Sequence, residues 1–174
     1  HPPTLDGPVH LYITAVLTAY DAPEAEALRH YFALNPGPNP NLLIYGLFYG
    51  LAQFLPLGVA EKVLVGGYVV GLPLAVRYAA RGLGAKAWLA ALLALPLVLS
   101  LTLHLGFYNY SYGLLTVPLA LGAYLRADAA PRLARYLLLG LAGLLVIAAH
   151  IFAALALLAM VAVAALWRAY LQHR

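Results

Sequence analysis

The chain has 174 residues, 64% hydrophobic and 9% charged, and its mean hydropathy is +0.86. Because soluble domains carry about 25% charged residues, this composition excludes an ordinary water-soluble domain and predicts an all-α, polytopic transmembrane helical bundle. The net charge of +4 comes without a basic run interleaved with aromatic residues, and cysteine is absent, so we expect no nucleic-acid partner, disulfide or thiolate metal site.

Residues 1–40 form a polar beginning, which we expect to be a loop outside the membrane. Within it, DAPEAEALRHYFAL predicts a short helix with Asp21 as its N-cap and Pro23 and Glu24 in the first turn. The run NPGPNPN at 35–41 predicts a stiff connection. Since no signal peptide is visible, we expect an upstream membrane helix of the same protein to bring the chain out.

The apolar stretch 41–56 lies between Pro40 and Pro56 and is shorter than the roughly 20 residues that a membrane span needs. Tyr45 and Tyr49 are four residues apart and therefore share one face of a helix. This pattern predicts a helix lying at the membrane surface, with a tilted short span as the alternative.

Four stretches are long and apolar enough for spans within the membrane domain 57–174, at about 59–78, 87–104, 108–125 and 133–167. The last is too long for one helix and short for two with a loop. A histidine in the bilayer core is costly, so we expect the chain to break near His150, leaving two short halves.

Basic residues gather in three clusters near the ends of the predicted spans: Arg77, Arg81 and Lys86; Arg126, Arg132 and Arg135; Arg168 and Arg174. The positive-inside rule places all three clusters in the cytoplasm. Residues 1–40, the turn at 104–110 and His150 then share the outer face. We therefore expect an integral protein of a bacterial inner membrane whose first 40 residues are outside.

Asp6 and His10 are the predicted catalytic residues, in the motif TLDGPVH. Gly7 and Pro8 restrict the backbone after the acid, and an imidazole four residues later can meet it on one helical turn. The pair could share a proton or hold a divalent cation, a cofactor that the sequence leaves uncertain. The alternative is that Asp6 only caps a helix beginning at Pro8.

The outer turn HLGFYNYSYG offers substrate-binding residues, namely His104, Tyr108, Asn109 and Tyr110. The tyrosines are also typical of an aromatic belt at the membrane surface, but a belt does not need the histidine or the asparagine. His150 is a further substrate-binding candidate, with an interfacial hydrogen-bonding role as the alternative.

Lys62 is the last substrate-binding candidate, because it could meet a phosphate. The alternative is that Glu61 and Lys62 pair or extend toward water at the outer end of their span.

Several of these stretches resemble the GT-C superfamily of membrane glycosyltransferases, which use polyprenyl-phosphate sugars. An external loop with an early acid, in LDGPVHLY, leads through a Pro/Asn-rich turn into an interfacial helix. The stretch GVAEKVLVGGYVVGLPLAVRYAARGLGAKAWLAALLALPLVL is similar to the next two spans, and LLLGLAGLLVIAAHIFAALALL to a later pair. LDGPVHLY and HLGFYNYSYG look most like a group of bacterial membrane proteins of GT-C-like architecture.

The resemblance implies a membrane lipid and a polyprenyl-phosphate sugar donor as partners. It makes Asp6 the general base or the residue that orients the acceptor, and it implies a C-terminal part of the same protein beyond this sequence. A carboxylate can take the proton of an attacking sugar hydroxyl, and His104, His150 or Lys62 could neutralise the leaving phosphate. Many members carry a second acid in the motif, which has no counterpart beside Asp6.

Two other functions remain open. A non-enzymatic scaffold or assembly module would have the same composition and spans. A transporter would place polar residues at mid-membrane on broken helices, whereas here they gather at one face.

Overall fold

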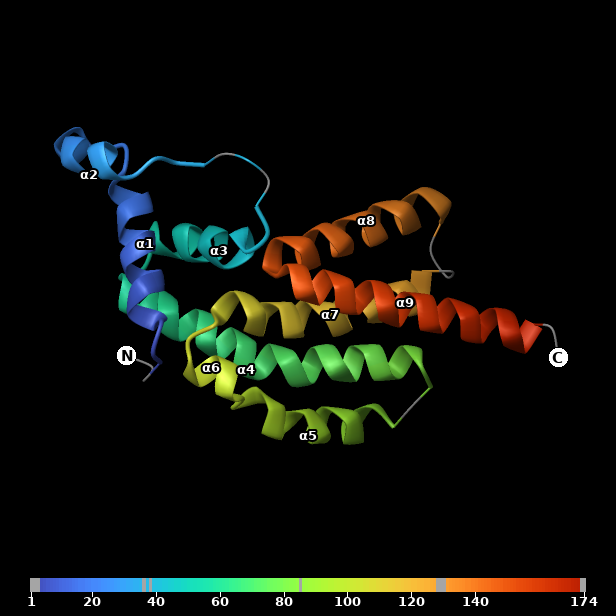
Figure 1. Cartoon of the computed structure of the whole chain (residues 1–174). Helices are drawn as coiled ribbons and strands as arrows, with labels where there is room; N and C mark the ends of the chain where they lie inside the picture. Colours follow the sequence, from blue (N-terminus) through green and yellow to red (C-terminus); the bar gives the residue numbers. More distant parts are fainter. Residues whose placement is uncertain (1–3, 36, 38, 85, 128–130, 173–174) are drawn as a thin grey trace.

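The computed structural model describes residues 4–35, 37, 39–84, 86–127 and 131–172. Every regular element within these ranges is helical, as the composition predicts, and Figure 1 shows their arrangement. In chain order the elements are α1 (Gly7–Ala19), the 3-10 helix η1 (Pro23–Ala25), α2 (Glu26–Tyr31), α3 (Leu42–Ala52), α4 (Leu57–Gly82), α5 (Ala87–Val98), α6 (Leu101–His104), α7 (Tyr108–Arg126), α8 (Arg132–Ala149) and α9 (Ile151–Gln172).

Three helices in the described part of the chain are long and apolar enough to cross a membrane: α4, α8 and α9. The helices expected at 59–78 and 108–125 are present as α4 and α7. Helix α7 has 19 residues, which is the length of a span, but its tyrosine-rich beginning leaves it less apolar than the three candidates.

The continuous span expected at 87–104 is wrong. Helix α5 ends at Val98 after 12 residues, and Ser100 is extended, with φ −67° and ψ 159°. Pro96 lacks the N–H that would bond to the preceding turn. Ser100 then begins the short helix α6 by accepting hydrogen bonds from the backbone N–H groups of Leu103 and His104.

The break expected near His150 is confirmed. Helix α8 ends at Ala149, His150 is extended, and α9 begins at Ile151. The two halves are not short, however. They contain 18 and 22 residues, or about 27 and 33 Å at the helical rise, and both are long and apolar enough to cross a membrane. A one-residue break uses almost none of the chain, which is why both halves keep their length.

In the polar beginning, the short helix expected after Asp21 is confirmed as η1 and α2, but Asp21 is not its cap. The N-cap residues are Ala22 and Ala25. The expected loop also contains the 13-residue helix α1. Helix α3 has 11 residues, too few to cross a membrane, and it packs against α1, α4, α7 and α8.

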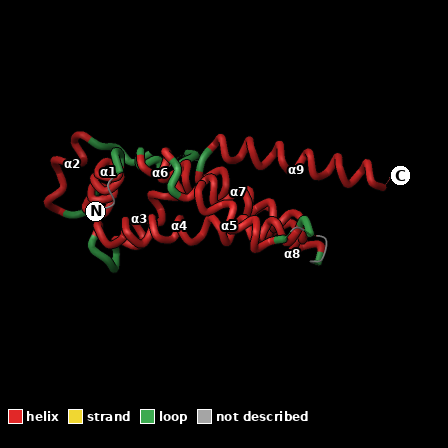
Figure 2. The backbone as a smooth tube through the Cα atoms, turned by 90° about the horizontal axis from the view of Figure 1, so that it is seen from below, coloured by secondary structure: helices red, strands yellow, loops and turns green. Residues whose placement is uncertain are grey.

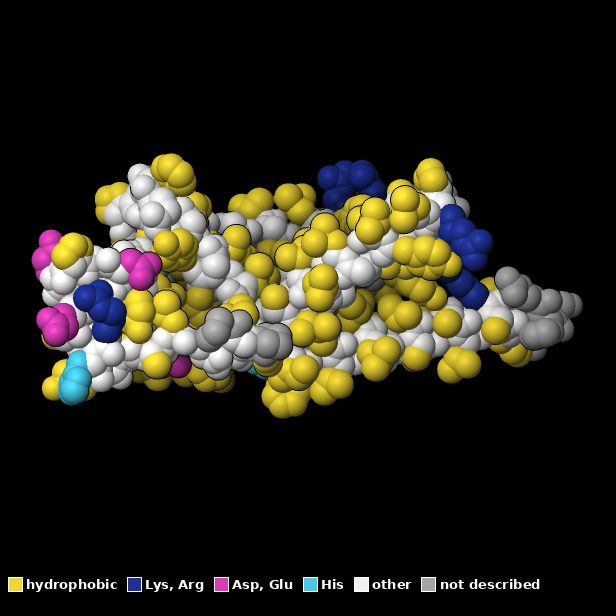
Figure 3. Space-filling view, turned by 90° about the horizontal axis from the view of Figure 1, so that it is seen from above, with side chains coloured by type: hydrophobic (Ala, Val, Ile, Leu, Met, Phe, Trp, Pro, Cys, Tyr) yellow, Lys and Arg dark blue, Asp and Glu magenta, His cyan; other side chains and the backbone are white. Residues whose placement is uncertain are grey.

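The long helices alternate in direction, so one end of the bundle carries α1, α2, α3 and α6 (Figure 1). Helix α4 runs from that end, α5 returns, α7 runs away, α8 returns toward α3 and α9 runs away again. Seen from below, α9 stands apart from α4 and α5 (Figure 2). We call the end with α1–α3 and α6 the polar end and the other the basic end. Figure 3 shows acidic side chains gathered where α2 lies.

Candidate functional site

The segment before α1 is fixed by the loop before α7. The backbone N–H groups of Leu5 and Asp6 donate to the carbonyl oxygens of His104 and Leu105 at 3.1 and 3.0 Å. Gly106 permits this approach because its φ is +80°, and a Cβ there would lie 2.8 Å from the nitrogens of Asp6 and Gly7. The loop therefore sets the position of Asp6.

Asp6 occupies the N-cap position of α1, but its side chain makes no capping hydrogen bond. Its backbone is helical, with φ −93° and ψ −2°, whereas a capping residue usually has an extended backbone. Pro8 lies in the first turn. The half-buried carboxyl group of Asp6 thus does not bond to the end of α1 and instead lines a cleft.

His10 is buried and both of its ring nitrogens have protein partners. Nε2 lies 3.0 Å from the carbonyl oxygen of Gly106, so it carries the proton, and Nδ1 accepts from the hydroxyl of Tyr45 at 3.0 Å. Burial lowers the pKa of His10; the Gly106 hydrogen bond and the charges of Asp6 and Glu61 oppose this. The neutral ring therefore fastens α1 to α3 and to the loop rather than sharing a proton with Asp6.

A cleft of about 490 Å³ opens beside Asp6, between the start of α1, the start of α3, the α6–α7 turn and the α8–α9 junction. Its lining residues are Asp6, His10, Asn41, Thr102, Phe107, Asn109, Tyr110, His150 and Phe152. The structure thus brings together five of the residues predicted from sequence, which lie up to 144 positions apart (150 − 6) along the chain: Asp6, His10, Asn109, Tyr110 and His150.

Three other predicted residues lie outside the cleft lining. His104 is exposed, and its Nδ1 lies 3.0 Å from the carbonyl oxygen of Ser100. Lys62 is exposed on α4. Tyr108 is buried behind the cleft, with its ring stacked on His10 at a centroid distance of 5.0 Å.

The expected extension of Glu61 toward water is wrong, because Glu61 is fully buried. Its Oε1 accepts a hydrogen bond from the hydroxyl of Tyr108 at 2.7 Å. Successive residues on a helix point about 100° apart, so Lys62 turns outward while Glu61 turns into the bundle.

Two asparagines give the cleft polar atoms that have no protein partner. The Oδ1 atoms of Asn41 and Asn109 are both buried and accept no hydrogen bond among the described residues. Asn41 has φ +80° at the N-cap of α3, a conformation that asparagine tolerates better than most residues. Buried polar groups normally find partners, so these oxygens suit a ligand that donates hydrogen bonds.

His150 contributes a donor. Its Nδ1 accepts from the backbone N–H of Phe152 at 3.2 Å, which leaves the proton of the neutral ring on Nε2. The ring meets the edge of Tyr110 at 5.3 Å. His150 stands directly before the first residue of α9, where the helix dipole favours negative charge.

Asn41 and Thr102 were not predicted from the sequence. The turn-rich run before α3 was the available signal for Asn41, since it contains several asparagines next to an apolar helix. In the described residues no group of three or more His, Cys, Asp or Glu could hold a metal ion. The alternative of a divalent cation on Asp6 and His10 therefore has no third His, Cys, Asp or Glu ligand among the described residues, and both nitrogens of His10 are occupied.

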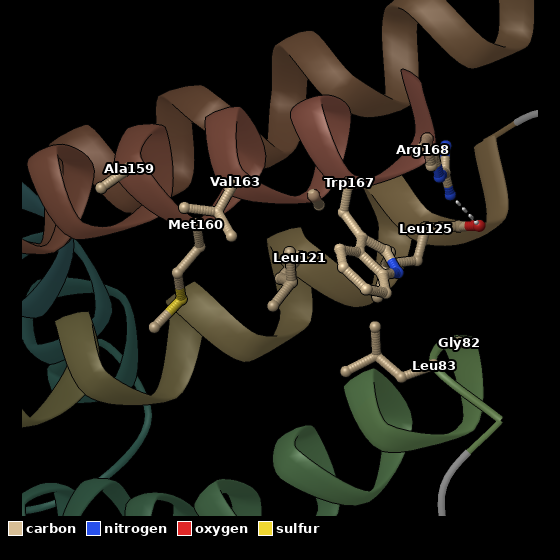
Figure 4. A pocket seen from close by; sticks show the side chains of 10 residues that line it. Gly82, Leu83, Leu121, Leu125, Ala159, Met160, Val163, Trp167 and Arg168 are labelled. Atoms are coloured by element: carbon tan, nitrogen blue, oxygen red, sulfur yellow. Dashed lines mark hydrogen bonds between the residues drawn. The ribbon is translucent and has the colours of Figure 1, made fainter. Parts of the chain in front are cut away.

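The polar cleft lies next to an apolar groove. A hollow of about 340 Å³ between α4, α5, α7 and α9 shares Tyr110 and Phe152 with the cleft. It shares Leu121 and Met160 with a third hollow of about 700 Å³ at the basic end. Figure 4 shows this last part, where side chains of α7 and α9 face Leu83. We call the two apolar hollows together the α7–α9 groove.

Comparisons with protein-family models, with curated proteins and with solved structures gave no match to this chain.

Proposed function

We propose that this protein is a membrane glycosyltransferase that transfers a sugar from a polyprenyl-phosphate carrier at the external face of a bacterial inner membrane. The observation that carries the proposal is that the polar cleft and the α7–α9 groove are neighbours, with Tyr110 and Phe152 lining both. A lipid-linked sugar has the same two-part chemistry, with a polyhydroxylated head and a long apolar tail.

The size of the α7–α9 groove suits a long tail. It follows α7, whose 19 residues extend about 28 Å at the helical rise. The tail of a common phospholipid fills one leaflet, about half of a core roughly 30 Å thick. A polyprenyl chain is longer and would occupy the groove over most of its length.

The cleft supplies the groups for transfer by displacement. The acceptor hydroxyl attacks the anomeric carbon of the donor sugar, and Asp6 takes the hydroxyl proton as the new carbon–oxygen bond forms. The bond from that carbon to the phosphate oxygen breaks, and the phosphate leaves with the electron pair. Nε2–H of His150 is the donor placed to stabilise the leaving oxygen, because no lysine or arginine is among the described cleft residues.

The partnerless oxygens of Asn41 and Asn109 fit sugar hydroxyls as donors. The expected orientation places the polar end outside, since the helix directions bring residues 4–35, the 104–107 turn and His150 toward it and the basic loops to the opposite end (Figure 1). This arrangement follows the positive-inside rule.

The test uses the full chain in proteoliposomes with undecaprenyl-phosphate hexoses as donors and measures release of undecaprenyl phosphate. Asp6→Asn should lower the release rate about 100-fold or more, because it removes the base. Its melting temperature should stay near that of wild type, since the Asp6 side chain makes no capping bond. The matched control is Asp21→Asn, which removes an exposed carboxylate at the same end and should leave the rate unchanged.

Full transfer activity in Asp6→Asn would contradict the assignment of the base. Failure of undecaprenyl phosphate to raise the melting temperature would favour the second candidate, a non-enzymatic assembly module. That candidate is supported by the exposed apolar side chains of Leu5, Val9 and Tyr12 around α1, together with Tyr31 of α2.

A further inference from the structure

We infer that Glu61 is a positioning residue, which holds the segment carrying Asp6 in place through Tyr108 and Thr4. Glu61 lies in the first turns of α4, and none of its surface is exposed. It does not line the cleft. A carboxyl group buried in this way is costly unless its oxygens are well hydrogen-bonded, so its presence directly behind the cleft calls for a role there.

The hydrogen bonds form a directed chain. The Tyr108 hydroxyl has one proton, which it donates to Oε1 of Glu61 at 2.7 Å. Oγ1 of Thr4 lies 2.9 Å from the same hydroxyl oxygen and must therefore be the donor of that bond. The chain runs from α4 through α7 to Thr4, two residues before Asp6, and it fixes the direction of each bond.

Close packing seats the segment against the same carboxyl group. A Cβ at Gly7 would lie 2.7 Å from Oε1 of Glu61 and 2.9 Å from the Tyr108 hydroxyl, and it would also collide with Oγ1 of Thr4. The backbone next to Asp6 is therefore in contact with the Glu61–Tyr108 pair on one side. The same segment is also held by the N–H groups of Leu5 and Asp6, which donate to the carbonyl oxygens of His104 and Leu105.

The inference rests on the proposed function only in treating Asp6 as the base; the chain of contacts does not depend on any substrate. Holding a reacting group in one geometry contributes to rate, and Asp6 has no side-chain cap bond of its own to hold it. Glu61 thus supplies the orientation that the N-cap position does not.

The experiment measures backbone hydrogen exchange of the full chain in detergent micelles or nanodiscs, without donor or acceptor. The reporter is the peptide 4–10, whose Leu5 and Asp6 amides donate hydrogen bonds to carbonyl groups of the α6–α7 turn. Glu61→Met removes the acceptor at similar length, and Tyr108→Phe removes the donor while keeping the ring on His10. Both should speed exchange of this peptide at least tenfold.

Two matched variants separate positioning from other roles. Glu61→Gln keeps a carbonyl acceptor for the Tyr108 hydroxyl and should exchange within twofold of wild type. Tyr112→Phe makes the same change one turn along α7, where the hydroxyl bonds the Leu64 carbonyl oxygen at 2.9 Å, and it should leave the peptide 4–10 unchanged.

The inference is wrong if Glu61→Met and Tyr108→Phe exchange like wild type, or if all peptides, including those of α9, speed up equally. It is also wrong if Glu61→Gln behaves like Glu61→Met. Should Glu61→Met fail to fold, Tyr108→Phe against Tyr112→Phe decides the question alone. Because no sugar donor or acceptor is used, absence of transferase activity would leave the result intact.

Discussion

Nε2 of His10 and the carbonyl oxygen of Gly106 lie 3.0 Å apart, and this bond joins positions separated by 96 residues. It ties α1 to the loop that also holds Leu5 and Asp6. The bond requires a proton on Nε2, and the bond from Tyr45 requires a free lone pair on Nδ1. The folded protein therefore prefers a neutral His10.

Stability should fall as the pH drops below about 6.5. Burial lowers the pKa of His10 from its ordinary value of 6.5. As the pH falls, His10 is therefore protonated in the unfolded chain before it is protonated in the folded protein, and this lowers the free energy of unfolding. The contribution is complete above pH 6.5 and is lost as the pH falls through the folded pKa. Melting temperatures between pH 7.5 and 4.5 measure it. His10→Gln should flatten the profile relative to wild type, and an unchanged profile would show that His10 does not titrate this way.

Gly106→Ala should destabilise the protein and release the segment before α1. The methyl group would meet two backbone nitrogens at 2.8 Å in addition to adopting φ +80°. The control is Gly84→Ala, which has φ +70° but nothing within 4 Å. A positive φ alone costs about 1 kcal/mol or somewhat more for alanine. In denaturant unfolding, Gly106→Ala should lower the free energy of unfolding at least twice as much as Gly84→Ala. Equal losses would mean that the close approach at Gly106 does not affect stability.

Ala156→Trp should block the α7–α9 groove. Ala156 lines the smaller of its two hollows together with Leu114 and Val117, where an indole would take the space proposed for a polyprenyl tail. The rise in melting temperature on adding undecaprenyl phosphate should be abolished. Ala165→Trp, at an exposed site elsewhere on α9, is the control and should keep the full rise. Loss of the rise in both variants, or in neither, would place the lipid elsewhere.

The polar end should face outside. Because the chain has no cysteine, single variants can be labelled without background. Asn35→Cys should react with an impermeant maleimide in intact cells, and Lys86→Cys should react only after permeabilisation; both positions are exposed. The basic loop at 128 lies outside the described residues, so Lys86 represents that face. Equal labelling at both positions would overturn the orientation.

The elements that the sequence predicted well are those whose signal is local. The interruption at His150 follows from one polar residue in a long apolar run, and α4 from its length and composition. The predicted span at 87–104 is too long because hydropathy averages over Pro96 and Ser100, between which α5 ends. Helix α1 is predicted only as the alternative in which Asp6 caps a helix beginning at Pro8, because the proline- and glycine-containing beginning is also typical of a loop.

The candidate site was predicted in part for the same reason. Asp6, Asn109 and His150 stood out as polar residues at the outer ends of apolar stretches, and they do meet in one cleft. Glu61 did not stand out, because its partner Tyr108 is 47 positions away. Which side of α4 faces α7 is decided by packing, and a single sequence carries no signal for that choice.

The α7–α9 groove has a kinetic consequence if the proposed function holds. Its border is the lightly covered helix α9, whose Leu155, Leu158 and Val163 are exposed, so a carrier would arrive sideways from the bilayer instead of from water. The rate would then depend on the mole fraction of carrier among the lipids, not on its bulk concentration. Diluting the carrier with inert phospholipid at constant total amount should slow turnover, whereas adding buffer should not.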